Sequence, residues 1–167
     1  MKSKHLLASL ALCALLPWAA PVRAVDLIPV RQITPELARD IAQHAIDTCR
    51  KHGYQVTAVV VDREGIPQVM IRDVFASRFT IEIAEAKANA VILSGVSSGE
   101  FLRNRADIRP EMDQVHGVLM LRGGLPIRAA GSLVGAVGVS GAPGGDKDEI
   151  CARAGVDAVR ARLGFAE

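Results

Sequence analysis

The stretch Tyr54–Arg72, YQVTAVVVDREGIPQVMIR, predicts two β-strands joined by a tight turn. The apolar run that ends at Val61 is followed by Asp62-Arg63-Glu64-Gly65, in which the aspartate and the glycine suit a hairpin turn. A second apolar run follows from Pro67. Because strands joined in this way are antiparallel, the sequence favours an α+β fold over a doubly wound nucleotide-binding fold.

Helices and further strands are expected around this hairpin. Cap residues and apolar periodicity mark three helices, at residues 35–52, 77–93 and 146–163. A short helix opens at Ser97, whereas the polar residues 104–114 are expected to form a loop. Three apolar segments between glycine turns are expected to be strands: Val118–Leu121, Ile127–Ala130 and Leu133–Ser140.

The first 24 residues have the features of a secretory signal peptide. Lys2 and Lys4 precede the apolar run Leu6–Leu16, and Val22-Arg23-Ala24 resembles a cleavage site. The run is too short to span about 30 Å of hydrocarbon as a membrane anchor. We therefore expect a periplasmic or secreted protein that begins at Val25, with an N-terminal arm at 25–33, one domain at 34–167 and no anchor after cleavage.

Composition and motif searches narrow the classes of function. The 167 residues carry a net charge of +2 and only 4% aromatic side chains. Removal of the first 24 residues leaves 17 basic against 18 acidic residues, which disfavours nucleic acid as a partner. The glycines of 135–141 lack the Lys-Ser/Thr of a P-loop, so we expect no nucleotide cofactor. Neither a His-x-x-x-His nor a Cys-x-x-Cys pair occurs, so we expect no zinc site.

Two histidines fall among apolar positions of the first expected helix. At 100° per residue, one stripe of 80° holds Leu37, Ile41, His44, Thr48 and His52. An inward His44 is placed to bind the iron of a flat macrocycle, and the alternatives are a core histidine at His44 and an exposed helix-end histidine at His52. His116, in a glycine-bounded loop beside Met112 and Met120, is the second candidate for an iron ligand.

Lys87 is an unusual residue on the second expected helix. It lies beside Thr80, Ala84 and Val91 rather than among the polar residues. A single ammonium group in such surroundings requires an anion, either the carboxylate of a ligand or an Asp or Glu of the protein.

Cys49 and Cys151 are the two cysteines that remain after cleavage. An even pair in an oxidising compartment is typical of a disulfide. Antiparallel packing of the first and last helices would bring the two residues together, and a pair of buried free thiols is the alternative. The last helix also has a face of small residues, from which we expect self-association.

Four segments in a fixed order resemble the GlcG/HbpS haem-binding family, and are similar to the C-terminal module of PduO-type corrinoid adenosyltransferases. They are Val59–Gly65, Ala84–Ala88, Gly123–Ile127, and Gly135–Gly141 followed by Asp146. The resemblance covers residues 34–165. It implies a five-stranded antiparallel sheet flanked by helices, profilin- or PAS-like, in a homo-oligomer that binds haem. It also implies haem degradation or iron handling in some members and a sensor or metabolic partner protein in others.

The residues of these segments divide into structural and ligand-binding candidates. Turn and helix-start roles are expected for Asp62, Gly65, Gly123, Gly124, Pro126 and Asp146. Ligand contacts are expected from Lys87, Arg72, Ser140 and the loop 141–145 that begins at Gly141, whose amides are suited to a carboxylate. Two hypotheses follow: an exported haem-binding protein, or an oligomeric accessory module that binds a small organic acid or a partner without haem. An enzyme acting on a small metabolite is a third.

Overall fold

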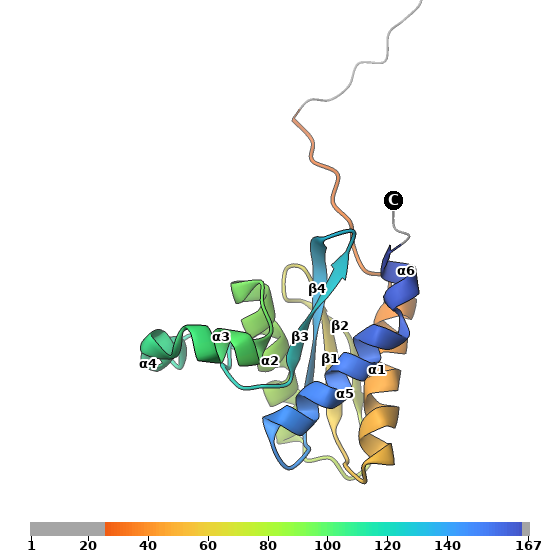
Figure 1. Ribbon diagram of the computed structural model, residues 1–167, viewed down its shortest axis with the longest axis vertical. Coiled ribbons are helices and arrows are strands. Elements are labelled where there is room, and N and C mark those ends of the chain that lie inside the picture. Colours follow the sequence, from red (N-terminus) through yellow and green to blue (C-terminus); the bar gives the residue numbers. More distant parts are fainter. Residues whose placement is uncertain (1–25, 165–167) are drawn as a thin grey trace, which may run out of the picture. The chain divides into compact units, whose positions relative to one another are not determined.

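The computed structural model describes residues 26–164 in two units (Figure 1). Residues 26–30 form an extended segment with the exposed apolar side chains Leu27, Ile28 and Val30. The second unit starts at Arg31 and holds every helix and strand found in residues 26–164. The expected signal peptide lies outside the described residues.

The described part of the second unit contains six α-helices, one 3-10 helix and four β-strands. They are α1 (Pro35–Lys51), β1 (Thr57–Asp62), β2 (Pro67–Arg72), α2 (Phe79–Ser94), α3 (Ser98–Asn104), η1 (Ala106–Ile108), α4 (Arg109–Met112), β3 (Gly124–Ala129), β4 (Ser132–Ser140), α5 (Gly145–Ala158) and α6 (Arg160–Gly164). Within residues 26–164, no helix is long and apolar enough to cross a membrane.

The sheet has four antiparallel strands in the order β2-β1-β4-β3, so the expectation of five strands is wrong. The missing strand is Val118–Leu121, whose backbone bonds to helices instead. The amide of Leu119 donates to the carbonyl of Ala86 on α2 at 3.0 Å, and the carbonyl of Leu121 accepts from the Ser98 hydroxyl at 2.7 Å. The apolar pattern of this segment reflects packing on α2, which a single sequence does not distinguish from strand pairing.

Each face of the sheet is covered by helices (Figure 1). Ala58 and Val60 point to the face covered by α1 and α5, whereas Val59 and Val61 point to the face covered by α2. Burial on both faces explains the uninterrupted apolar run of β1. A Cβ atom at Gly138 of β4 would overlap the Ala84 carbonyl of α2, so a residue without a side chain is required there.

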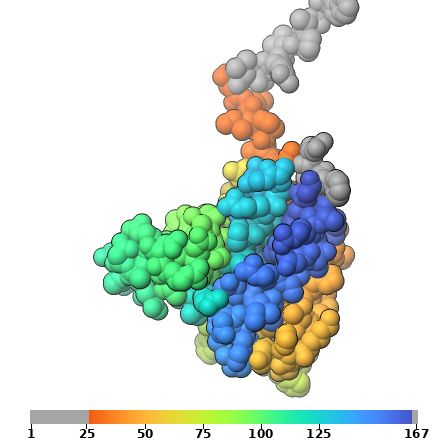
Figure 2. All heavy atoms as spheres, in the orientation of Figure 1, coloured from red at the N-terminus to blue at the C-terminus, as the bar shows by residue number. Residues whose placement is uncertain are grey.

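The segment between α2 and β3 differs from the expected loop. Residues 106–112 form η1 and α4, and Pro110 in the first turn of α4 favours this helical start. With α3 they project from the body of the unit (Figure 2). A small core holds them to α2, formed by Ala90, Phe101 and Met120.

Candidate functional site

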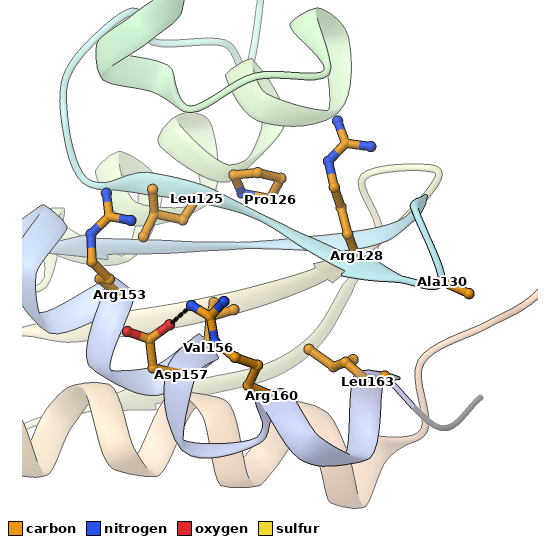
Figure 3. Close-up of a pocket in the computed structure, with 10 residues that line it drawn as sticks. Leu125, Pro126, Arg128, Ala130, Arg153, Val156, Asp157, Arg160 and Leu163 are labelled. Carbon is orange, nitrogen blue, oxygen red and sulfur yellow. Dashed lines mark hydrogen bonds and ion pairs between the residues drawn. The ribbon is translucent and has the colours of Figure 1, made fainter.

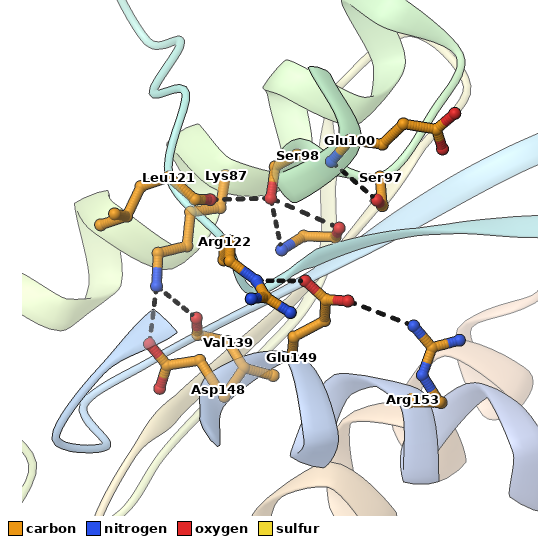
Figure 4. A network of polar contacts seen from close by, with 11 residues as sticks. Lys87, Ser97, Ser98, Glu100, Leu121, Arg122, Val139, Asp148, Glu149 and Arg153 are labelled. Atoms are coloured by element: carbon orange, nitrogen blue, oxygen red, sulfur yellow. Dashed lines mark hydrogen bonds and ion pairs between the residues drawn. The ribbon is translucent and has the colours of Figure 1, made fainter. Parts of the chain in front are cut away.

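Three of the four family-like segments meet at a buried ion pair between α2 and α5, through Lys87, Gly123 and Val139 (Figure 4). Lys87 is 1% exposed, and its ammonium donates to the Asp148 carboxylate at 2.7 Å and to the Val139 carbonyl at 2.9 Å. Of the two partners considered for Lys87, the protein carboxylate is the one present. The Lys87 ammonium is therefore paired inside the fold.

Burial acts against both charges of this pair. Desolvation lowers the pKa of Lys87 and raises the pKa of Asp148, while the attraction between the two groups opposes each shift. A buried pair of this kind depends on both partners, because loss of one leaves the other charge unpaired. The ion pair, together with the hydrogen bond from Lys87 to Val139, holds α2 against α5 and β4.

Asp148 is the residue of this cluster that the sequence analysis missed. Besides the ammonium, it accepts the backbone amide of Ala142 at 2.9 Å. The loop 141–145 does bind a carboxylate through its backbone, but that carboxylate comes from the protein itself. A signal was available, since Asp148 lies three residues before the buried Cys151 and so continues the buried face of the helix.

Ser140, Gly141 and Asp146, the other candidates in and beside the loop 141–145, lie at the end of β4 and the start of α5. Ser140 is the buried last residue of β4, 5% exposed. Gly141 has φ of +133°, and a Cβ atom there would lie 2.6 Å from the carbonyl oxygen of Gln55. Asp146 was expected to cap the last helix, but α5 begins at Gly145 with Gly144 as an N-cap that makes no side-chain bond.

Of the two expected turns, only the one after β1 is present in the described chain. The Asp62 carboxylate accepts the amides of Glu64 and Ile66, each at 2.9 Å, and Gly65 has φ of +86°. Before β3, Gly123 has φ of +122°, and a side chain there would meet the buried ammonium. Gly124 and Pro126 then lie within β3 rather than in a turn before it.

Arg72 belongs to a braced loop that follows β2. Its guanidinium donates to the carbonyls of Asp73, Val74 and Ala76. The Asp73 carboxylate, 3% exposed, accepts two bonds from Arg50 at 2.8 and 2.9 Å. Arg72 therefore shapes this loop instead of facing a cavity.

His44 is exposed, so its expected inward position is wrong. The buried face of α1 consists mainly of small residues: Ala38, Ile41, Ala42, Ala45, Ile46 and Cys49. The predicted apolar stripe is centred on the larger side chains of this helix. In the structure the helix packs closely against α5, and this packing buries the face that carries the alanines. A Cβ atom on Gly155 of α5 would lie 2.5 Å from the Ile41 carbonyl, which shows how close the two helices are.

This helix contact also changes the interpretation of the small residues on the last helix. Cys151, Ala152 and Gly155 are buried against the rest of the same chain, and Ala158 is exposed. These buried residues are explained by packing on α1. Of the face from which self-association is expected, Cys151, Ala154, Ala158 and Ala161, only Cys151 is buried, whereas Ala154 is half-buried and Ala161 is exposed like Ala158.

His116 lies at a groove on the outer side of α2, with a cavity volume of about 560 Å³. The lining residues are Glu82, Ile83, Glu85, Ala86, Asn89, His116, Gly117, Val118 and Leu119. Asn89 fixes the loop wall of this α2 groove, because its amide donates to the Gly117 carbonyl at 3.1 Å. The groove thus combines an imidazole, an apolar floor and two carboxylates.

A second groove lies between β3 and helices α5 and α6, with a volume of about 340 Å³ (Figure 3). Its apolar lining includes Leu125, Val156 and Leu163. Arg160 is paired with Asp157, as the dashed line shows. None of the residues that line this β3 groove has an imidazole, thiol or thioether group. His44 lines neither this groove nor the α2 groove.

Metal ions have no ready site in the part of the chain that the structure describes. No group of three or more His, Cys, Asp or Glu side chains between residues 26 and 164 is arranged to hold one. The α2 groove therefore does not hold its imidazole and carboxylates as a closed metal centre.

Cys49 and Cys151 form a disulfide in the structure. Their Cα atoms are 5.5 Å apart, within the usual range for a disulfide, and both side chains are fully buried. The sequence left two alternatives, a disulfide and a pair of buried free thiols, and the structure contains the disulfide. It joins the end of α1 to the first half of α5.

Comparison with known proteins places these features in a wider context. A family model described as "Haem degrading protein HbpS-like" matches residues 33–157. A double mutant of Streptomyces reticuli HbpS is 36% identical and superimposes with a TM-score of 0.77, over 89% of this chain and all of that one. No curated protein matches the chain.

More distant structures share the fold. Klebsiella pneumoniae protein ORFY is 23% identical, with a TM-score of 0.74 over 81% of this chain and 96% of that one. A PduOC:heme complex is 20% identical, with a TM-score of 0.69 over 82% of this chain and all of that one. At these identities the likeness concerns the architecture of the sheet and its helices.

Proposed function

Since this chain belongs to the HbpS-like family, we propose that it binds haem, and that the α2 groove is the site. The observation that carries the proposal is His116 beside an apolar floor in a groove large enough for a small molecule. The fold supports it as well, because PduOC was solved with heme.

The residues that line the α2 groove suit the iron and the porphyrin ring of haem, but not its propionates. A neutral imidazole suits iron, and Ile83, Val118 and Leu119 offer apolar contacts to a porphyrin ring. Glu82 and Glu85 do not suit propionates, so the carboxylate edge of the ring is expected to leave the groove at one end. The β3 groove fits less well, since its lining supplies no iron ligand.

Bound haem would supply an iron centre capable of redox chemistry. The chain's own residues would hold it: His116 at the metal, the loop wall fixed by Asn89, and the apolar floor of α2. A role in haem degradation and iron handling extends the proposal, on the strength of the family's description. It predicts that released iron accumulates when the complex is incubated with oxygen and a reductant.

A haemin titration followed by visible absorption tests the proposal. We expect a saturable Soret shift at one haem per chain, which His116→Ala reshapes. His52→Ala and His44→Ala serve as matched controls, because both histidines are exposed on α1 or at its end. No saturable shift at tens of micromolar haemin would refute haem binding and leave the accessory-module hypothesis.

Export is part of the proposal. The disulfide supports it, because such bonds persist mainly in oxidising compartments. We infer that the mature protein begins at Val25 in the periplasm or outside the cell. Intact-mass measurement of the protein recovered from the exporting host tests this, and a chain that retains Met1 would contradict it.

We also propose self-association, through the loop after β2 rather than through the last helix. The loop after β2 holds Val74 and Phe75 at 73% and 85% exposure, although Arg72 and Asp73 brace it firmly. A rigid loop with large exposed apolar side chains is typical of a contact surface. Light scattering of wild type and Phe75→Ser tests it, and a monomeric wild type at micromolar concentration would refute it.

A further inference from the structure

The two carboxylates of the α2 groove pose a problem for any ligand that carries its own carboxylates. Glu82 and Glu85 both line the groove, and no Lys or Arg is among its lining residues. Like charges at short range repel, most strongly where water is partly excluded. A haem propionate therefore requires a cation beyond the residues that line the groove itself.

Phe79 extends the apolar side of the groove toward the start of α2. It precedes Ile83 by four residues and Ala86 by seven, so the three share one side of the helix. At 1.5 Å per residue, Phe79 lies about 10 Å along the axis from Ala86. The Phe79 side chain is 55% exposed, which leaves its ring open to a ligand.

Arg78 lies on this ring. Its guanidinium carbon is 4.1 Å from the centre of the Phe79 ring, a cation–π distance. Within residues 26–164, no ion pair involves Arg78. The residue directly precedes the first turn of α2, where a positive charge does not stabilise the helix. Glu82, four residues later in the first turn, is an acidic neighbour on the helix, but the two side chains form no ion pair in the described structure, so the guanidinium is open to a ligand.

We propose that Arg78, held on Phe79, binds a propionate of a haem in the α2 groove and makes the site selective for tetrapyrroles with free carboxylates. The inference rests on the proposed function. The ring would lie along the apolar side of α2 with its carboxylate edge at the start of the helix, where Arg78 precedes Glu82 by four residues and offsets its charge. A guanidinium is well suited to this role, because it binds a carboxylate through two parallel hydrogen bonds.

Haemin and haemin dimethyl ester, which lacks the free carboxylates, distinguish this interaction from general apolar binding. We expect Arg78→Gln to weaken haemin binding about tenfold, the range of one charge-assisted hydrogen bond, without changing the Soret position. The ester should bind wild type and variant equally. Arg78→Lys should restore part of the affinity, because it keeps the charge but loses the paired geometry.

Arg103→Gln is the matched control, since Arg103 is an exposed arginine on α3 that makes no ion pair in the described chain. Far-ultraviolet circular dichroism verifies that each variant is folded. Equal haemin affinities of wild type and Arg78→Gln would overturn the assignment of Arg78 while leaving haem binding intact. A wild type that binds neither compound would overturn the proposed function and this inference together.

Discussion

Reduction of the Cys49–Cys151 disulfide is expected to remove a large part of the stability of this protein. The bond closes a loop between residues 102 positions apart. In the chain-entropy model, a loop of this length stabilises the folded state by about 4.7 kcal/mol at 25 °C. Comparison of oxidised and reduced wild type isolates this contribution, because the two forms have the same side chains.

Urea denaturation with and without a phosphine reductant measures the difference. With a slope of about 2 kcal/mol per molar urea, the expected loss moves the unfolding midpoint down by about 2 M. The reduced protein should also show a steeper transition, since its unfolded chain exposes more surface. Because both sulfurs are fully buried, reduction without urea should be slow and limited by opening of the fold.

Two results would refute this reasoning. A midpoint shift of less than about 0.5 M after reduction verified by mass would mean that the loop contributes little. Two reactive thiols in urea-unfolded protein that was never reduced would mean that the bond does not form. The expected mature chain has no other cysteine, so the thiol count is unambiguous.

Three substitutions test the packing and the charges. Gly138→Ala should destabilise the fold by about 3 kcal/mol or more, because its methyl group would overlap a carbonyl of α2, whereas Gly164→Ala, in open space, should be neutral in the same thermal melts. Asp148→Asn should cost about 3–5 kcal/mol in urea unfolding, since it leaves a buried lysine unpaired, and a loss below 1 kcal/mol would contradict the role of the pair. The hydrogen bonds from Arg50 lower the pKa of Asp73 below its usual 3.8, so the Asp73 carboxylate stabilises the fold above pH 3.8, and this stabilisation is lost as the pH falls through the lowered pKa. Asp73→Asn should therefore reduce the dependence of the unfolding free energy on pH in the acid range. An unchanged dependence would refute this role of Asp73.

Local signals in the sequence predicted the hairpin well. Asp62 and Gly65 have the turn chemistry that the structure uses, and the α+β class followed from that turn. The number of strands did not follow. Val118–Leu121 is apolar because it packs on α2, and tertiary contact of this kind leaves the same pattern as a strand.

The candidate site was harder to predict, for reasons of geometry. A helical wheel centred on large apolar residues turned His44 inward, while the real contact with α5 uses alanines. Lys87 was correctly seen to need an anion, but its partner lies 61 residues away on another helix. The acidic lining beside His116 depends on how the loop after α4 crosses α2, which no local pattern specifies.

The first turns of α5 hold both sides of the sheet at once. Asp148 connects this helix to α2 on one side, and Cys151, less than one turn later, connects it to α1 on the other. A chain that ends before Gly145 has neither of these two connections. If the protein crosses a membrane unfolded, as a signal peptide implies, completion of its fold and oxidation of its cysteines await the arrival of the same helical segment. Folding would then be timed by translocation, and a truncation just before α5 should yield a protease-sensitive chain even though every strand is present.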